Sequence, residues 1–128
     1  MLDTCAFLWV VSDQTKLSSR ALSILADTGN SFSISAITVN EVHRLIRKGK
    51  ISVNAPGVLQ DWFRKALIQH SIRCEPIGFE IARAAEVLPA IHNDPADRFI
   101  LATAQIMNGR VLSPDTTMPK YPNITVEW

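Results

Sequence analysis

The sequence lacks long hydrophobic runs, internal repeats, charge blocks and abundant cysteine. Its longest unbroken apolar run, Ala6 to Val11, is far shorter than the ~18 residues or more that cross a bilayer, and no basic stretch precedes it as in a signal peptide. The two cysteines, Cys5 and Cys74, form no Cys-x-x-Cys pair, which favours reduced thiols over a disulfide scaffold or a metal site. We expect a soluble protein of the cytoplasm with no membrane partner.

The sequence also lacks an excess of charge of one sign. Its 13 Lys and Arg residues against 12 Asp and Glu residues give a net charge of +1, which excludes a broad basic field for nucleic acid. Any contact with nucleic acid must therefore be local. The 128 residues are 47% hydrophobic and 20% charged, which fits one folded domain spanning residues 1–128 and excludes disorder.

Helical and extended patterns alternate along the chain. A helix capped by Ser18 is expected to end before Gly29, and Thr38 is expected to cap a later helix with Glu41 in capping-box spacing. The other expected segments are strands at 32–37, 72–77, 110–112 and 124–128, and helices at 58–69, 79–88 and from Pro95 toward Gly109. This alternation predicts an α/β fold with a mostly parallel sheet and helices on both faces.

Carboxylates recur at the ends of these segments. Asp3 follows Met1 and Leu2, and Asp115 follows the apolar pair before Ser113, so both are expected at the carboxyl edge of the sheet, where such sheets place their sites. Three further acids begin helices: Glu41, Asp94 and Asp97. Helix capping explains each of them singly.

As a set, these acids suggest a cation, because converging like charges repel one another unless they are neutralised. All-oxygen ligands suit Mg²⁺ or Mn²⁺, which can lower the pKa of a bound water and clamp a phosphodiester. The residues therefore favour metal-dependent phosphodiester hydrolysis. Such a metal would itself supply the positive charge that the net charge of the chain does not.

The ordered series of motifs resembles one family. It consists of Leu2-Asp3-Thr4 with Phe7-Leu8-Trp9, Ser35 to Val42, His92 to Arg98 running into Ile100 to Ala104, Ser113-Pro114-Asp115, and the terminal Trp128. Together these segments closely resemble PIN-domain ribonucleases of the VapC toxin type, over essentially the whole chain. The resemblance implies a three-layer α/β/α fold, a Mg²⁺- or Mn²⁺-dependent endoribonuclease acting on structured RNA such as tRNA or rRNA, a VapB-like antitoxin partner and a homodimer.

The resemblance also assigns roles by position. The catalytic, metal-binding quartet would be Asp3, Glu41, Asp97 and Asp115, with Asp94 as an accessory acid. Thr4 and Ser113 would orient carboxylates or waters through hydrogen bonds. Family members usually carry several residues before the first Asp, where this sequence has Met1 and Leu2, so Asp3 is expected to be less firmly held.

Several residues admit two interpretations. The cations near Glu41 either grip RNA phosphates or act as partners of a helix C-terminus: Arg44, Arg47, Lys48 and Lys50. Arg98 either pairs with Asp94 or faces RNA. Trp62 and Phe63 raise the question of an apolar groove for an antitoxin helix. His43 and His92 are expected to be structural or solvated.

Two other functions remain open at this point. The chain would be a PIN-like module that binds RNA or protein with weak or no cleavage, or a regulatory domain phosphorylated on one of its clustered Asp residues. The second requires a lysine at the end of a late strand, whereas Lys120 lies between Pro119 and Tyr121. We rank it below the nuclease and the binding module.

Overall fold

The structure is a computed structural model that describes residues 1–53, 59–91 and 94–128. Along the chain, the described elements are α1 (Thr4–Ser12), η1 (Gln14–Lys16), α2 (Ser19–Ala26), β1 (Phe32–Ser35), α3 (Ile37–Arg47), α4 (Leu59–Gln69), β2 (Ile72–Glu75), α5 (Phe79–Val87), α6 (Pro95–Ile106), β3 (Val111–Leu112), η2 (Met118–Lys120) and β4 (Val126–Glu127). Within the described residues, no helix is long and apolar enough to cross a membrane.

The strands form two parallel pairs, β1 with β2 and β3 with β4, and the first residues of the chain join them. The Leu2 N–H donates to the Ser33 carbonyl at 2.8 Å. On the other side, the Leu112 N–H donates to the Met1 carbonyl at 2.8 Å, and the Asp3 N–H donates to the Leu112 carbonyl at 3.1 Å. The short first segment is thus hydrogen-bonded on both sides, and the expectation of a loosely held Asp3 is wrong.

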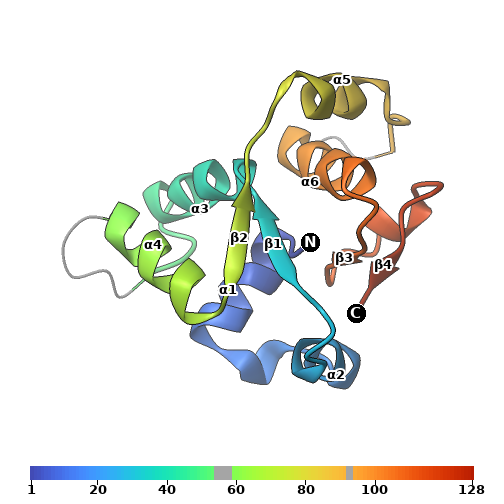
Figure 1. Ribbon diagram of the computed structural model, residues 1–128. Helices are drawn as coiled ribbons and strands as arrows, with labels where there is room; N and C mark the ends of the chain where they lie inside the picture. Colours follow the sequence, from blue (N-terminus) through green and yellow to red (C-terminus); the bar gives the residue numbers. More distant parts are fainter. Residues whose placement is uncertain (54–58, 92–93) are drawn as a thin grey trace.

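Each face of this sheet carries its own apolar core. Side chains of α1 to α4 pack on one face, where the ring of Phe7 stacks on that of Phe63 with centroids 5.9 Å apart. Side chains of α5 and α6 pack on the other face. Val111 belongs to the second core and Leu112 to the first, as alternation along a strand requires. Figure 1 shows α3 and α4 on one side of β1 and β2, with α5 and α6 on the other. The predicted α/β/α fold is confirmed.

The start of α3 departs from the expected pattern. The Ala36 N–H donates to the Glu75 carbonyl at 2.9 Å, so the chain stays paired with β2 until one residue before the helix. Ala36 is the N-cap and makes no side-chain capping bond. Thr38 instead lies within α3, fully buried, and its hydroxyl has no hydrogen-bond partner within the described part of the chain. The predicted capping box between Thr38 and Glu41 is therefore wrong.

Candidate active site

Asp3 lies at the carboxyl edge of the sheet, between β1 and β3. Its Oδ1 accepts a hydrogen bond from the Ala6 N–H at 2.6 Å and so caps α1, and its Oδ2 accepts one from the Ser113 hydroxyl. Burial of the carboxyl raises its pKa to about 6, against the opposing effect of the bonds from Ser113 and Ala6, and the charges of Glu41 and Asp115 add to the rise. Asp3 is therefore held rigidly beside other acids.

Glu41 reaches the same edge from α3. The Thr4 hydroxyl donates to its Oε2 at 2.5 Å, and Arg44 Nη2 lies 3.5 Å from its Oε1. Only 13% of the Glu41 side chain is exposed. Thr4 thus orients a carboxylate, which is the position that the resemblance implied for it.

Asp115 follows β3 and is tied to Asp3 through Ser113. The Asp115 N–H donates to the Ser113 hydroxyl oxygen at 3.0 Å, while that hydroxyl donates to Asp3. The Asp115 Oδ1 accepts from the N–H groups of Thr117 at 2.5 Å and Met118 at 3.0 Å. Ser113 therefore fixes the relative positions of two carboxylates.

Asp94 and Asp97 lie at the start of α6. The Asp94 Oδ1 caps this helix by accepting from the Ala96 N–H at 3.0 Å, and its Oδ2 accepts from Arg44 Nη2 at 3.1 Å. Asp97 lies in the first turn and is half-buried. We call Asp3, Glu41, Asp94, Asp97 and Asp115 the acid edge.

Cys5 shows that the quartet shares one region. Burial, followed by the charges of the quartet, raises the pKa of the Cys5 thiol to about 11; the contributing acids are Asp3, Glu41, Asp97 and Asp115. The sequence analysis did not assign Cys5 to this site. Its place directly after Asp3-Thr4, in the first turn of α1, was the signal that could have found it.

The acid edge fits a hard divalent cation in its donor chemistry and its charge. Each carboxylate oxygen has two lone pairs, so the hydrogen-bonded oxygens retain capacity for a metal. Over residues 1–53, 59–91 and 94–128, however, no three acid, histidine or cysteine side chains are placed so that they could hold one ion together. A metal would have to draw these carboxylates closer.

Comparisons with known proteins identify the family and the fold of the chain. The family model for the PIN domain matches residues 1–124. The chain belongs to the PIN-domain family. A chain in the crystal structure of VapBC2 from Rickettsia felis, bound to a DNA fragment from their promoter, superposes with a TM-score of 0.69 at 15% identity, over 99% of this chain and 96% of that one. A search of curated proteins found no match.

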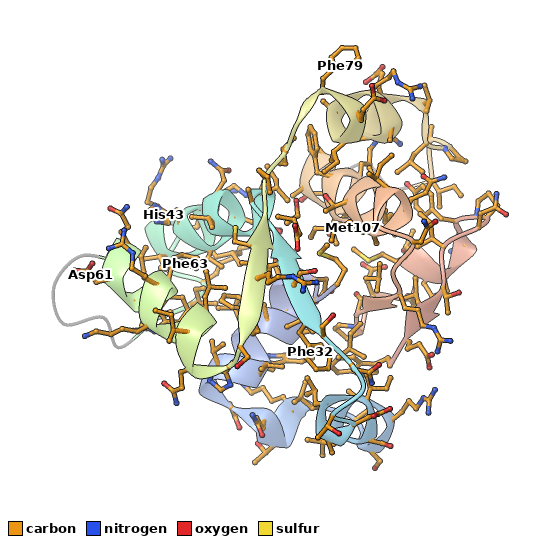
Figure 2. All side chains as sticks on the ribbon, in the orientation of Figure 1. Phe32, His43, Asp61, Phe63, Phe79 and Met107 are labelled. Atoms are coloured by element: carbon orange, nitrogen blue, oxygen red, sulfur yellow. The ribbon has the colours of Figure 1, made fainter. Side chains whose placement is uncertain are left out.

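The basic residues of this PIN domain separate into different roles. Arg47 in the last turn of α3 is exposed, as are Lys48 and Lys50 after it, whereas Arg44 pairs with Glu41 and Asp94 of the acid edge. His43 is also exposed, and its ring stacks on that of Phe63 with centroids 6.2 Å apart. Figure 2 labels both residues, His43 on α3 and Phe63 on α4. His92 lies outside the described residues.

Arg98 does not have either of its expected roles. Its guanidinium donates to carbonyl oxygens at the C-terminal end of α5, at 2.8 Å to Ala85, 3.2 Å to Glu86, 2.9 Å to Leu88 and 2.9 Å to Pro89. These carbonyls have no partner within α5, because a helix leaves its last carbonyls unpaired. Arg98 is therefore a helix-capping residue, which removes it from the predicted RNA contacts. Arg44, not Arg98, pairs with Asp94.

A cavity of about 660 Å³ opens at the opposite edge of the sheet, beside Arg20, Arg73 and Arg110. Arg20 and Arg110 both pair with Glu127, and Arg73 pairs with Glu75. The cations there are already paired with carboxylates, whereas at the acid edge the charges of Glu41 and Asp115 add to the raised pKa of Asp3. We therefore place the candidate chemistry at the acid edge rather than in the larger cavity.

Proposed function

We propose that this PIN domain is a Mg²⁺- or Mn²⁺-dependent endoribonuclease that hydrolyses phosphodiester bonds in structured RNA such as tRNA or rRNA. The observation that carries the proposal is the shared field of Asp3, Glu41, Asp97 and Asp115 around one thiol, in a chain of the PIN-domain family. Mutually repelling, partly buried carboxylates make cation binding favourable.

The residues of the acid edge and of α3 would have different roles in this reaction. Asp3, Glu41, Asp97 and Asp115 would hold the ion, and Asp94 would be an accessory acid. When bound, the ion would lower the pKa of a water molecule and neutralise charge on the scissile phosphodiester. Thr4 orients Glu41, and Ser113 orients Asp3 and Asp115, so these hydrogen bonds would keep the carboxylates at the edge from which they would converge on the ion. Arg47, Lys48 and Lys50 would contact RNA phosphates from the end of α3.

We further propose that the chain is a toxin paired with a VapB-like antitoxin, acting as a homodimer in the cytoplasm. The similar fold seen in VapBC2, which is a complex bound to promoter DNA, supports this proposal. Phe63 is buried against Phe7, so this side chain is not available to an antitoxin helix. Trp62, beside it on α4, remains half-buried.

RNA cleavage tests the nuclease proposal. We expect the wild-type chain to cleave total RNA in Mn²⁺ or Mg²⁺ and to lose activity in chelator. Asp97→Asn removes one ligand charge and should lower the cleavage rate about a thousandfold, since a catalytic metal contributes several kcal/mol. Asp61→Asn, at an exposed position in the first turn of α4, removes the same charge and is the matched control. Equal cleavage by wild type and Asp97→Asn would contradict the proposal.

A second function is a PIN-like module that binds RNA or protein without cutting it. The observation in its favour is that no three ligands within the described part of the chain stand ready to hold an ion. This alternative predicts RNA or partner binding that is the same in Mn²⁺ and in chelator, with intact RNA recovered from both.

A further inference from the structure

We infer that Arg44 is a positioning residue that acts as an exchangeable counter-cation of the acid edge: it neutralises Glu41 and Asp94 in the metal-free protein and yields them to a divalent ion. The inference rests on the proposed function and concerns how its site is kept stable before the metal binds. It assigns Arg44 a role toward the metal rather than a simple contact with RNA.

The geometry places one guanidinium between two helices. Arg44 lies one turn beyond Glu41 on α3, and its Nη2 is 3.5 Å from Glu41 Oε1 and 3.1 Å from Asp94 Oδ2 at the start of α6. The Asp94 and Glu41 carboxylates raise the pKa of Arg44, with the hydrogen bond to Asp94 the largest cause. A single side chain thus compensates two acids, and one of them, Asp94, lies 50 residues from Arg44 along the sequence.

Both acids are fixed independently of Arg44. The Thr4 hydroxyl holds the second oxygen of Glu41, and the Ala96 N–H holds the second oxygen of Asp94. Removal of the guanidinium would therefore leave both of these hydrogen bonds in place and would take one cation away from the two carboxylates. Carboxylates that lose a neighbouring cation bind a hard metal ion more readily.

Arg44 itself is able to move away at little cost. Its side chain is 42% exposed, so solvent can take over its hydrogen bonds, and exposed ion pairs contribute little to stability. Once displaced by a divalent ion, its guanidinium would remain near the site, where it is suited to a phosphate oxygen in a bidentate geometry. Arg44 would then leave the carboxylates of Glu41 and Asp94 and bind a phosphate of the RNA.

Mn²⁺ binding to the whole chain, measured by isothermal titration calorimetry, tests this inference. We expect Arg44→Gln to bind Mn²⁺ about threefold or more tightly than wild type, because the ion no longer competes with the guanidinium. Arg44→Lys should lie between the two, since an ammonium retains the charge and loses the forked geometry. Arg47→Gln removes the same charge from an exposed position on α3 and should change the Mn²⁺ affinity less than twofold.

A second measurement separates this role from a structural one. At saturating Mn²⁺, Arg44→Gln should raise the KM for RNA, so metal and RNA affinities should change in opposite directions. A residue that only supports the fold would weaken both. Unchanged or weaker Mn²⁺ binding by Arg44→Gln overturns the inference alone. Absence of Mn²⁺ binding by the wild-type chain overturns the proposed function and the inference together.

Discussion

Two arginines, in two regions of the molecule, illustrate opposite solutions to an electrostatic problem. At the end of α5, Arg98 donates to four backbone carbonyls, of which that of Pro89 also accepts a backbone bond from the Ile91 N–H. At the acid edge, Arg44 bridges two carboxylates while Asp3 keeps a pKa raised by burial and by its acidic neighbours. The α5 end is satisfied by the chain itself, whereas the acid edge is only partly compensated.

The difference separates a structural region from a reactive one. Backbone carbonyls have fixed positions and no competing ligand, so Arg98 gains nothing by leaving them. Carboxylates can exchange one cation for another, so a bridge such as that of Arg44 is reversible. A carboxylate such as Asp3, whose pKa is raised by burial beside other acids, marks a candidate binding site on physical grounds.

The largest effect on stability is expected from Arg98→Met. This change keeps the length of the side chain and removes every donor, leaving the carbonyls at the end of α5 without their partners. We expect the free energy of unfolding to fall by about 2–4 kcal/mol, at about 1 kcal/mol for each hydrogen bond lost. Urea denaturation in chelator measures this loss.

Arg44→Met is the matched comparison, and we expect it to change the free energy of unfolding much less than Arg98→Met, because its bridge is partly exposed. An equal loss for the two variants would remove the distinction between the two regions.

Asp3→Asn should raise the free energy of unfolding, whereas Arg98→Met lowers it, and the size of its effect should be intermediate. The pKa of Asp3 is about 6 in the folded chain, against an ordinary value of 3.8, so protonation of Asp3 favours the folded state. This contribution to the free energy of unfolding is lost as the pH rises from about 4 through 6. In chelator at pH 8, Asp3→Asn should therefore raise the free energy of unfolding by about 1–3 kcal/mol. Its stability should also vary less than that of the wild type between pH 4 and 7.

The control for this prediction is added metal. Mn²⁺ should raise the melting temperature of the wild type by mass action and that of Asp3→Asn much less. A variant that is less stable than the wild type at pH 8 in chelator would show that the acid edge carries no electrostatic cost.

Thr38→Val should have the smallest effect. Thr38 is fully buried, and its hydroxyl lacks a hydrogen-bond partner within the described residues. An isosteric methyl group removes this desolvation cost, so we expect the free energy of unfolding to rise by about 1 kcal/mol. Thermal denaturation of Thr38→Val beside Thr4→Val, which removes a bonded hydroxyl, tests the difference. Thr4→Val should be destabilising, and two losses of equal size would contradict the assignment.

Local patterns predicted much of this molecule because they report local physics. Ser18 caps α2 through the Ala21 N–H, and Asp94 caps α6 ahead of Pro95, as their positions in the sequence indicated. Contacts between residues far apart in the sequence could not be predicted in this way. Nothing near Arg98 in the sequence identifies the end of α5 as its partner, and the capping interpretation of Thr38 failed because Ala36 remains bonded to the β2 strand.

The sequence by itself indicated the alternation of strands and helices, and it placed Asp3 and Asp115 at the ends of strands and Asp94 and Asp97 at the start of a helix, because periodicity and capping depend on near neighbours. The expected place of Glu41 at a helix start is wrong, since Glu41 lies beyond the first turn of α3. Only the tertiary structure decided which charges meet. Asp3 and Ser113 lie 110 residues apart along the chain, and Arg44 and Asp94 lie 50 apart. Such pairs form because parallel strands bring their carboxyl ends to one edge, whatever the distance between them in the sequence.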